Sequence, residues 1–196
     1  MRIILASQSP RRKKLLQQLG FSFDVIPSTV DEFSTTKDPV LLVEELAYRK
    51  ANDVADRNAD SLIIGADTIV VKDKQILGKP KDRIEASETL NILSNTQHSV
   101  YTGVAIVSTD VNSKVLKSSS FSVMTSVYFS KLEQNEIESY IDTGSPMDKA
   151  GSYGIQDDWG ATFVEKIEGD FYNVIGLPLN KLYNELKLNF PEILKN

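Results

Sequence analysis

The chain has 196 residues, of which 41% are hydrophobic and 25% charged, and its formal net charge is −5. This composition is enough for a full hydrophobic core, and the acidic balance argues against a general role in binding nucleic acids or membrane surfaces. The absence of cysteine excludes disulfides, thiol nucleophiles and cysteine-bound metals. Because His98 is the single histidine, hydrolytic chemistry is expected to depend on carboxylates, cations and a hard metal ion. No apolar run approaches the roughly 18 residues of a transmembrane helix, so we expect a soluble, cytoplasmic protein.

The segment at residues 5–20, LASQSPRRKKLLQQLG, predicts a strand end, a turn and a helix in that order. Ser9 is the expected N-cap, Pro10 the first helical residue and Gly20 the stop. A strand, loop and helix arranged in this way direct backbone N–H groups at an anion. The sequence therefore predicts a phosphate-binding turn here.

Four cations follow Pro10 directly, although the helix macrodipole disfavours each of them by ~0.3–1 kcal/mol. At 100° per residue, Arg12 falls on the buried face and Arg11 at its rim, whereas Lys13 and Lys14 point to solvent. This pattern favours two arginines that face a bound anion. A basic surface helix whose arginine stems cover apolar residues remains the alternative.

A second helix is expected at residues 39–58, with Asp38 as its cap. Lys50 falls inside its apolar stripe, four residues after Leu46 and four before Val54. A lysine at such a position usually extends its ammonium to solvent. The alternative is that Lys50 is one of several cations that bind an anion.

The run at residues 62–71 predicts a strand covered on both faces, with one carboxylate, Asp67, in its middle. A buried ionised Asp costs several kcal/mol unless a cation, a metal or N–H donors compensate it. Gly65, two residues earlier, suggests a bend or bulge through which the carboxylate emerges. The alternative is an Asp bonded to a local turn.

Further strands are expected at residues 21–26, 75–77, 100–107, 115–129 and 163–167, and further helices at 82–93, 133–142 and 177–188. Residues 144–160 form a glycine-containing loop too long for a simple connection, which indicates function. The mixture of helices and strands along the whole chain predicts one α/β domain over residues 1–196.

The unusual polar residues fall into three chemical classes. The cations are Arg11, Arg12, Lys50 and Lys79; the acids are Glu32, Asp67 and Asp148; and the neutral donors are Ser7, Ser9, Thr68 and Gln156. Several cations around an anion-binding turn suit a polyphosphate, and an emergent carboxylate can orient water or hold a divalent metal.

A series of motifs, in this order along the chain, resembles the Maf family of nucleoside triphosphate pyrophosphatases. The motifs are LASQSPRR at 5–12, AYRKA at 47–51, GADT at 65–68, GKP at 78–80, His98 with Thr102-Gly103, DKAGSYGIQ at 148–156 and NVIGLPL at 173–179. The resemblance runs nearly end to end, and the first and sixth motifs are the most specific.

The resemblance implies a mixed, twisted sheet with flanking helices, in two lobes around a deep cleft, as in the inosine triphosphate pyrophosphatases. It implies cleavage between the α and β phosphates with a divalent metal such as Mg²⁺, Mn²⁺ or Co²⁺. Asp67 would be the proton acceptor, and Glu32 with Asp67 the metal ligands. The residues implied in substrate binding are Ser7, Ser9, Arg11, Arg12, Lys50, Thr68, Lys79 and Gln156.

Arg11, Thr68 and Gln156 match the branch of the family that acts on dTTP and UTP, which leaves modified pyrimidines open as substrates. Family analogy further implies a homodimer. The alternatives are a nucleotide-sensing regulator of cell division and a pyrophosphatase for inosine-type purine analogues. The chain departs from its relatives at residues 144–146 and at 157–160 after Gln156, and the second departure bears on the preferred base. His98 is interpreted as a structural residue.

Overall fold

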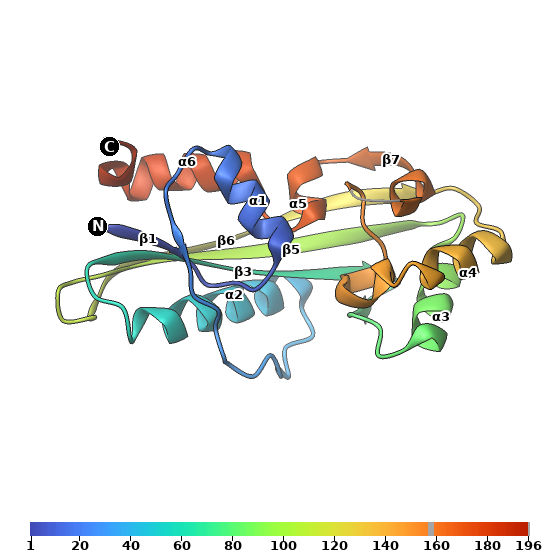
Figure 1. Cartoon of the computed structure of the whole chain (residues 1–196), viewed down its shortest axis with the longest axis horizontal. Helices are drawn as coiled ribbons and strands as arrows, with labels where there is room; N and C mark the ends of the chain where they lie inside the picture. The colour runs from blue at the N-terminus through green and yellow to red at the C-terminus, as the bar shows by residue number, and fades with distance from the viewer. Residues whose placement is uncertain (157–158, 196) are drawn as a thin grey trace. The chain divides into compact units, whose positions relative to one another are not determined.

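The computed structural model describes residues 1–156 and 159–195 and shows a mixed α/β protein (Figure 1). The chain forms two compact units. The first unit contains Met1–Asp67, Thr102–Val123 and Gly176–Asn196, and the second contains Thr68–Tyr101 and Met124–Ile175. Three long strands contribute residues to both units. The predicted α/β class is confirmed.

The sheet has the strand order β2-β1-β3-β5-β6-β7, with β4 paired to β3. The strands are β1 (Arg2–Leu5), β2 (Asp24–Val25), β3 (Ser61–Lys72), β4 (Gln75–Leu77), β5 (Gln97–Thr109), β6 (Val115–Phe129) and β7 (Val164–Glu168). Strand β1 runs parallel to β2 and β3, whereas β4 is antiparallel to β3 and β7 to β6. The sheet is therefore mixed, as the sequence predicted.

In the first unit, helices cover both faces of the sheet. The helices are α1 (Pro10–Gln18), α2 (Pro39–Ala55) and α6 (Leu179–Asn189), followed by the 3₁₀ helix η4 (Pro191–Lys195). Helices α1 and α6 lie on one face and α2 on the other (Figure 1). The connections β1–α1–β2 and β2–α2–β3 join parallel strands, which are almost always linked by right-handed crossovers. Because the two connections run in opposite directions across the sheet, right-handed crossovers place α1 and α2 on opposite faces.

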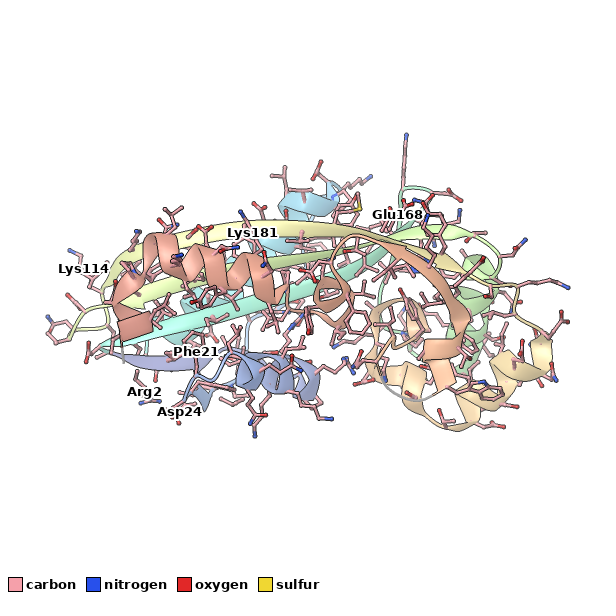
Figure 2. The ribbon with its side chains drawn as sticks, turned by 90° about the horizontal axis from the view of Figure 1, so that it is seen from above. Arg2, Phe21, Asp24, Lys114, Glu168 and Lys181 are labelled. Carbon is pink, nitrogen blue, oxygen red and sulfur yellow. The ribbon has the colours of Figure 1, made fainter. Side chains whose placement is uncertain are left out.

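Side-chain contacts secure the edges of this unit. Figure 2 shows Arg2 and Asp24 on adjacent strands, where the Arg2 Nε lies 2.7 Å from the Asp24 carboxylate. On α6, the Lys181 Nζ lies 5.7 Å from the centre of the Phe121 ring on β6. The predicted strand at 21–26 is reduced to Asp24–Val25, since only these residues pair with β1.

Helix α2 packs unusually close to two strands because both carry glycine at the contact. A Cβ added to Gly65 would lie 2.4 Å from the Ala47 carbonyl oxygen, and one added to Gly103 would lie 2.2 Å from the Val43 carbonyl oxygen. Strand β3 continues through Gly65, from Ser61 to Lys72. Glycine is present there to admit the helix backbone.

The second unit has its own core. It contains α3 (Arg83–Leu93), α4 (Gln134–Asp142), the 3₁₀ helices η1 (Ser145–Asp148), η2 (Ala150–Ser152) and η3 (Trp159–Phe163), and α5 (Phe171–Ile175). Fully buried side chains include Leu90, Leu93 and Tyr140. The Tyr140 and Phe163 rings meet edge to face, with centroids 5.1 Å apart. Helix α5 and the 3₁₀ helices were not predicted, since each is shorter than two full turns of periodic pattern.

Among the residues that the structure describes, no helix combines the length and apolar character needed to cross a membrane.

Replacing Gly103 by alanine tests the close contact with α2. The added methyl group would meet the backbone of Val43, so the helix must move away from the sheet. We expect Gly103→Ala to lower the free energy of unfolding by about 2–3 kcal/mol, measured by urea denaturation. Gly78→Ala is the matched control, since nothing lies within 4 Å of its added Cβ, and should change stability by less than about 0.5 kcal/mol. Equal losses in both variants would contradict the packing argument.

Candidate functional site

The N-terminus of α1 has the predicted capping arrangement. The Ser9 Oγ accepts a hydrogen bond from the Arg12 amide at 3.4 Å, and the Ser7 Oγ accepts one from the Ser9 amide at 3.1 Å. Pro10 begins the helix, and its first turn contains no acidic residue. The positive end of the helix dipole is thus combined with cationic side chains, which together attract an anion.

Arg12 turns back toward the body of the first unit. Its Nε donates to the Gly176 carbonyl at 2.9 Å, and its Nη1 lies 3.4 Å from the Ser7 Oγ. Arg11 is half-buried, whereas Lys13 and Lys14 are exposed. The predicted contrast between partly buried arginines and exposed lysines is confirmed.

The electrostatics of Arg12 show which charges surround it. Burial lowers the pKa of its guanidinium, Arg11 lowers it further, and the carboxylates of Asp67 and Glu32 raise it in partial compensation. Two arginines and two carboxylates of the first unit therefore interact electrostatically, although they come from three segments of the chain.

Lys50 links the two carboxylates directly. Its Nζ lies 2.6 Å from the Asp67 Oδ1 and 2.8 Å from the Glu32 Oε1. Lys50 is 9% exposed and Asp67 is 7% exposed. The lysine therefore does not extend its ammonium to solvent, and the Asp67 carboxylate binds Lys50 and not a local turn. The close packing of α2 on β3 brings the lysine stem within reach of the strand.

Three of the predicted site residues belong to the second unit. Thr68 follows Asp67 on β3 and is half-buried, Lys79 is exposed, and Gln156 is half-buried after η2. The Gly78 carbonyl accepts a hydrogen bond from the Gly151 amide at 3.1 Å. Two of the motifs found in sequence, GKP and DKAGSYGIQ, are thus neighbours within this unit. The departure at Asp157 and Asp158 lies outside the described residues.

Sequence reasoning missed Lys149, which is 8% exposed. Its Nζ donates to the Ser145 carbonyl at 2.6 Å and to the Ser145 Oγ at 2.9 Å, and lies 3.0 Å from the Asp148 carboxylate. These contacts fix the glycine-containing loop and engage Asp148, which was counted among the candidate acids. The sequence signal that could have pointed to Lys149 is a lysine placed among mostly small residues at 145–152.

His98 is a buried, neutral residue of the second unit. Its Nε2 lies 2.8 Å from the Tyr153 hydroxyl, and its ring packs edge to face on Phe129. Burial, with a smaller contribution from the charge of Lys72, lowers the pKa of His98 to about 4. Burial also raises the pKa of Tyr153, so its hydroxyl keeps its proton. These contacts agree with the interpretation of His98 as structural.

Comparison with known proteins identifies the family, since residues 2–189 match the one described as Maf-like protein. The chain belongs to the Maf family. A relative from Thermoanaerobacter sp. (strain X514), named dTTP/UTP pyrophosphatase, is 51% identical over 97% of both chains. Relatives with the same name are 52% identical in Alkaliphilus metalliredigens, over 96% of both chains, and 47% identical in Bacillus anthracis, over 95% of this chain and 94% of the relative.

Among solved structures, the Staphylococcus aureus Ham1 protein matches with a TM-score of 0.47 and 16% identity, over 66% of this chain and 72% of that chain. A similarity at this level carries no argument about function.

In this Maf-family chain, residues 1–156 and 159–195 contain no group of three or more His, Cys, Asp or Glu side chains that could hold a metal ion. The carboxylates of Glu32 and Asp67 nevertheless converge on one cationic centre, the Lys50 ammonium. Two carboxylates are the protein share that Mg²⁺ commonly takes when phosphate oxygens and water complete its shell. The pair therefore fits a hard cation that arrives with a phosphate ligand.

Replacing Lys50 tests the buried ion pair. Lys50→Met leaves two carboxylates close together without their shared cation, so we expect the free energy of unfolding to fall by about 3 kcal/mol. Denaturant unfolding in the presence of a chelator measures this without metal binding. Lys13→Met, which removes an exposed lysine of α1, is the control and should lie within about 0.5 kcal/mol of the parent. Equal stability of the two variants would contradict the assignment.

His98 predicts a pH-dependent stability. In the unfolded chain it binds a proton near pH 6.5, but in the folded protein only near pH 4. Acidification through this window therefore favours the unfolded state, by about 3 kcal/mol in total at 1.36 kcal/mol per pH unit. Unfolding free energies measured at pH 7, 6, 5 and 4 should fall more steeply for the parent than for His98→Gln. Parallel curves would show that His98 contributes nothing to the pH dependence.

Proposed function

We propose that this protein is a nucleoside triphosphate pyrophosphatase that hydrolyses dTTP and UTP to the monophosphate and pyrophosphate. The observation that carries the proposal is the buried Lys50–Asp67 pair, in electrostatic contact with Arg12 at a helix N-terminus. A protein that only binds a phosphate needs the cations but has no use for a buried carboxylate among them. Family membership and the names of the relatives support the same reaction.

The substrate-binding role falls first on the start of α1. Ser7 and Ser9 supply hydroxyl groups, and Arg11 and Arg12 supply charge that a polyphosphate can bridge. Arginine suits this task because its planar fork donates two parallel hydrogen bonds to phosphate oxygens. Arg12 is already oriented by the Gly176 carbonyl, so less of its rotamer freedom is lost on binding.

Asp67 is proposed as the proton acceptor. Its carboxylate is held at the Lys50 ammonium and can orient a water molecule for attack on phosphorus. A P–O bond then forms to the water oxygen, the α–β bridging P–O bond breaks, and Asp67 takes the proton. Lys50 and Arg12 compensate the charge that develops on the phosphate oxygens.

A divalent cation, Mg²⁺, Mn²⁺ or Co²⁺, would be held by Glu32 and Asp67 and, when bound, would neutralise phosphate charge. Lys50 contacts the same two carboxylates, so they are directed toward one point and their charge is compensated. We propose that hydrolysis requires this metal ion.

Family analogy assigns roles to three further residues. Lys79 is proposed to bind phosphate, and Thr68 and Gln156 to contact the base. On family analogy, we further propose that residues 1–196 form one Maf-like domain and that the protein acts as a homodimer in the cytoplasm.

A substrate panel with a pyrophosphate readout tests the activity. We expect dTTP and UTP to be hydrolysed in preference to inosine triphosphate and the other purine triphosphates, with modified pyrimidine triphosphates included in the panel. Preference for inosine-type substrates would favour the purine-analogue alternative. No release from any triphosphate, with retained nucleotide binding, would favour a nucleotide-sensing regulator.

Asp67→Asn tests the proton acceptor. The amide is nearly the same size but cannot accept a proton at neutral pH, so we expect kcat to fall by about 10²–10⁴-fold. Circular dichroism and nucleotide binding serve as the folding controls. A variant with the parental kcat would exclude Asp67 as the base.

A further inference from the structure

One side of α2 carries charged residues at intervals of four, continuing into the turn after the helix. They are Glu45, Arg49, Asp53 and Arg57. Neighbours in this row form ion pairs, at 3.4 Å between Arg49 and Glu45 and 2.8 Å between Arg57 and Asp53. Such i,i+4 pairs on a helix surface contribute little to stability by themselves. Their other contacts are more informative.

Every member of the row also bonds the segment 27–38, which has no helix or strand. The Glu45 Oε2 accepts hydrogen bonds from the Ser34 and Thr36 hydroxyls, both at 2.9 Å. These hydroxyls, Thr36 first, lower the pKa of Glu45. The charged row therefore holds the distal part of this segment against the helix.

The proximal part of the segment is held in the same way. The Asp53 Oδ2 accepts a hydrogen bond from the Thr29 amide at 3.0 Å, and the Arg57 Nη2 donates to the Pro27 carbonyl at 3.2 Å. The segment thus follows the helix in the opposite direction, from Arg57 back toward Glu45.

Arg49 makes the contact that matters for the site. Its Nη1 donates to the Phe33 carbonyl at 2.8 Å and its Nη2 donates to the Asp31 carbonyl, so the guanidinium bridges the two residues that flank Glu32. The Asp31 Oδ1 also accepts from the Phe33 amide at 2.9 Å, which closes the turn around Glu32. Lys50, the next residue of the helix, binds the Glu32 carboxylate.

We infer that Arg49 is a positioning residue, which fixes the backbone on both sides of Glu32 so that its carboxylate meets Lys50 beside Asp67. The Glu32 side chain is 59% exposed, so burial does not hold it in place. Lys50 binds the Glu32 carboxylate, whereas Arg49 binds the backbone on both sides of Glu32. The planar guanidinium of arginine donates from two separate nitrogens, so it can hold two carbonyl groups at once. Glutamine is shorter and donates from a single amide nitrogen, so it cannot replace both contacts. The inference rests on the proposed function, in which Glu32 serves the reaction.

A double-mutant cycle tests this role, with kcat and KM measured for dTTP across a metal titration. We expect Arg49→Gln to lower kcat/KM by about 10-fold or more, the usual cost of removing a residue that orients a metal ligand. In a Glu32→Gln background the same change should cost less than about 2-fold, because Arg49 acts through Glu32. Equal losses in both backgrounds would overturn the inference, since Arg49 would then act directly on substrate or on the whole fold.

Arg57→Gln is the matched control. Arg57 is also an arginine of the row, pairs with an acid four residues earlier and donates to a carbonyl of the same segment, but it does not flank Glu32. We expect its kcat/KM to stay within about 2-fold of the parent. A loss equal to that of Arg49→Gln would show that the segment as a whole, and not the contact at Glu32, sets the activity.

Hydrogen–deuterium exchange gives a readout that is independent of turnover. Arg49→Gln should accelerate exchange of the Phe33 amide and its neighbours, whereas Arg57→Gln should affect only the amides near Thr29. Unchanged exchange at Phe33 in Arg49→Gln would overturn the inference even if activity fell. If the parent protein releases no pyrophosphate, the proposed function fails, and the exchange data still decide whether Arg49 fixes the Glu32 turn.

Discussion

The close approach of helix α2 to the sheet is the constraint on which the site depends. Gly65 on β3 and Gly103 on β5 remove the side chains that would otherwise hold the helix away, so backbone packs on backbone. A lysine stem of fixed length then reaches across from the helix to a carboxylate on the strand. A larger residue at either glycine would push the helix away from the sheet and lengthen the 2.6 Å contact between Lys50 and Asp67.

The charges gathered in the first unit are costly to bury, and the way in which they are arranged explains why they are tolerated. Lys50 is shared by two carboxylates. Burial lowers the pKa of Arg12, and the same two carboxylates raise it in partial compensation. Arg12 also uses a carbonyl and a hydroxyl to satisfy its donors. Lys50 and Arg12 therefore interact with carboxylates before any ligand binds, and a polyphosphate can exchange for these partners without the exposure of an uncompensated ion.

Helix α2 serves the site with two of its faces. Its buried face contributes Lys50, and the adjoining exposed face carries the charged row that holds residues 27–38 and therefore Glu32. The two functions are coupled by consecutive residues, Arg49 and Lys50, which contact the backbone and the side chain of the same turn. In this way a segment without secondary structure holds a carboxylate beside Lys50.

Local rules made much of this predictable. Ser9 and Pro10 predict a helix start, because capping depends only on neighbouring residues. The 100° periodicity of a helix is also a local property, and it places Arg12 on a different side from Lys13 and Lys14. Asp67 stands out because an apolar strand cannot hold an unpaired acid. The partner of Lys50, the contacts of Lys149 and the role of Gly65 were not predictable in this way.

The sequence by itself determined the α/β class, the caps of α1 and α2, and the helix faces on which Arg12 and Lys50 lie. Only the tertiary structure decided that Lys50 turns inward to Asp67 and Glu32. The same is true of Arg49, which binds the backbone carbonyls on both sides of Glu32. Periodicity gives the direction of a side chain from its own element, whereas its partner comes from another element whose distance is set by packing. In this protein that distance is set by two glycines, whose effect exists only once the helix lies on them.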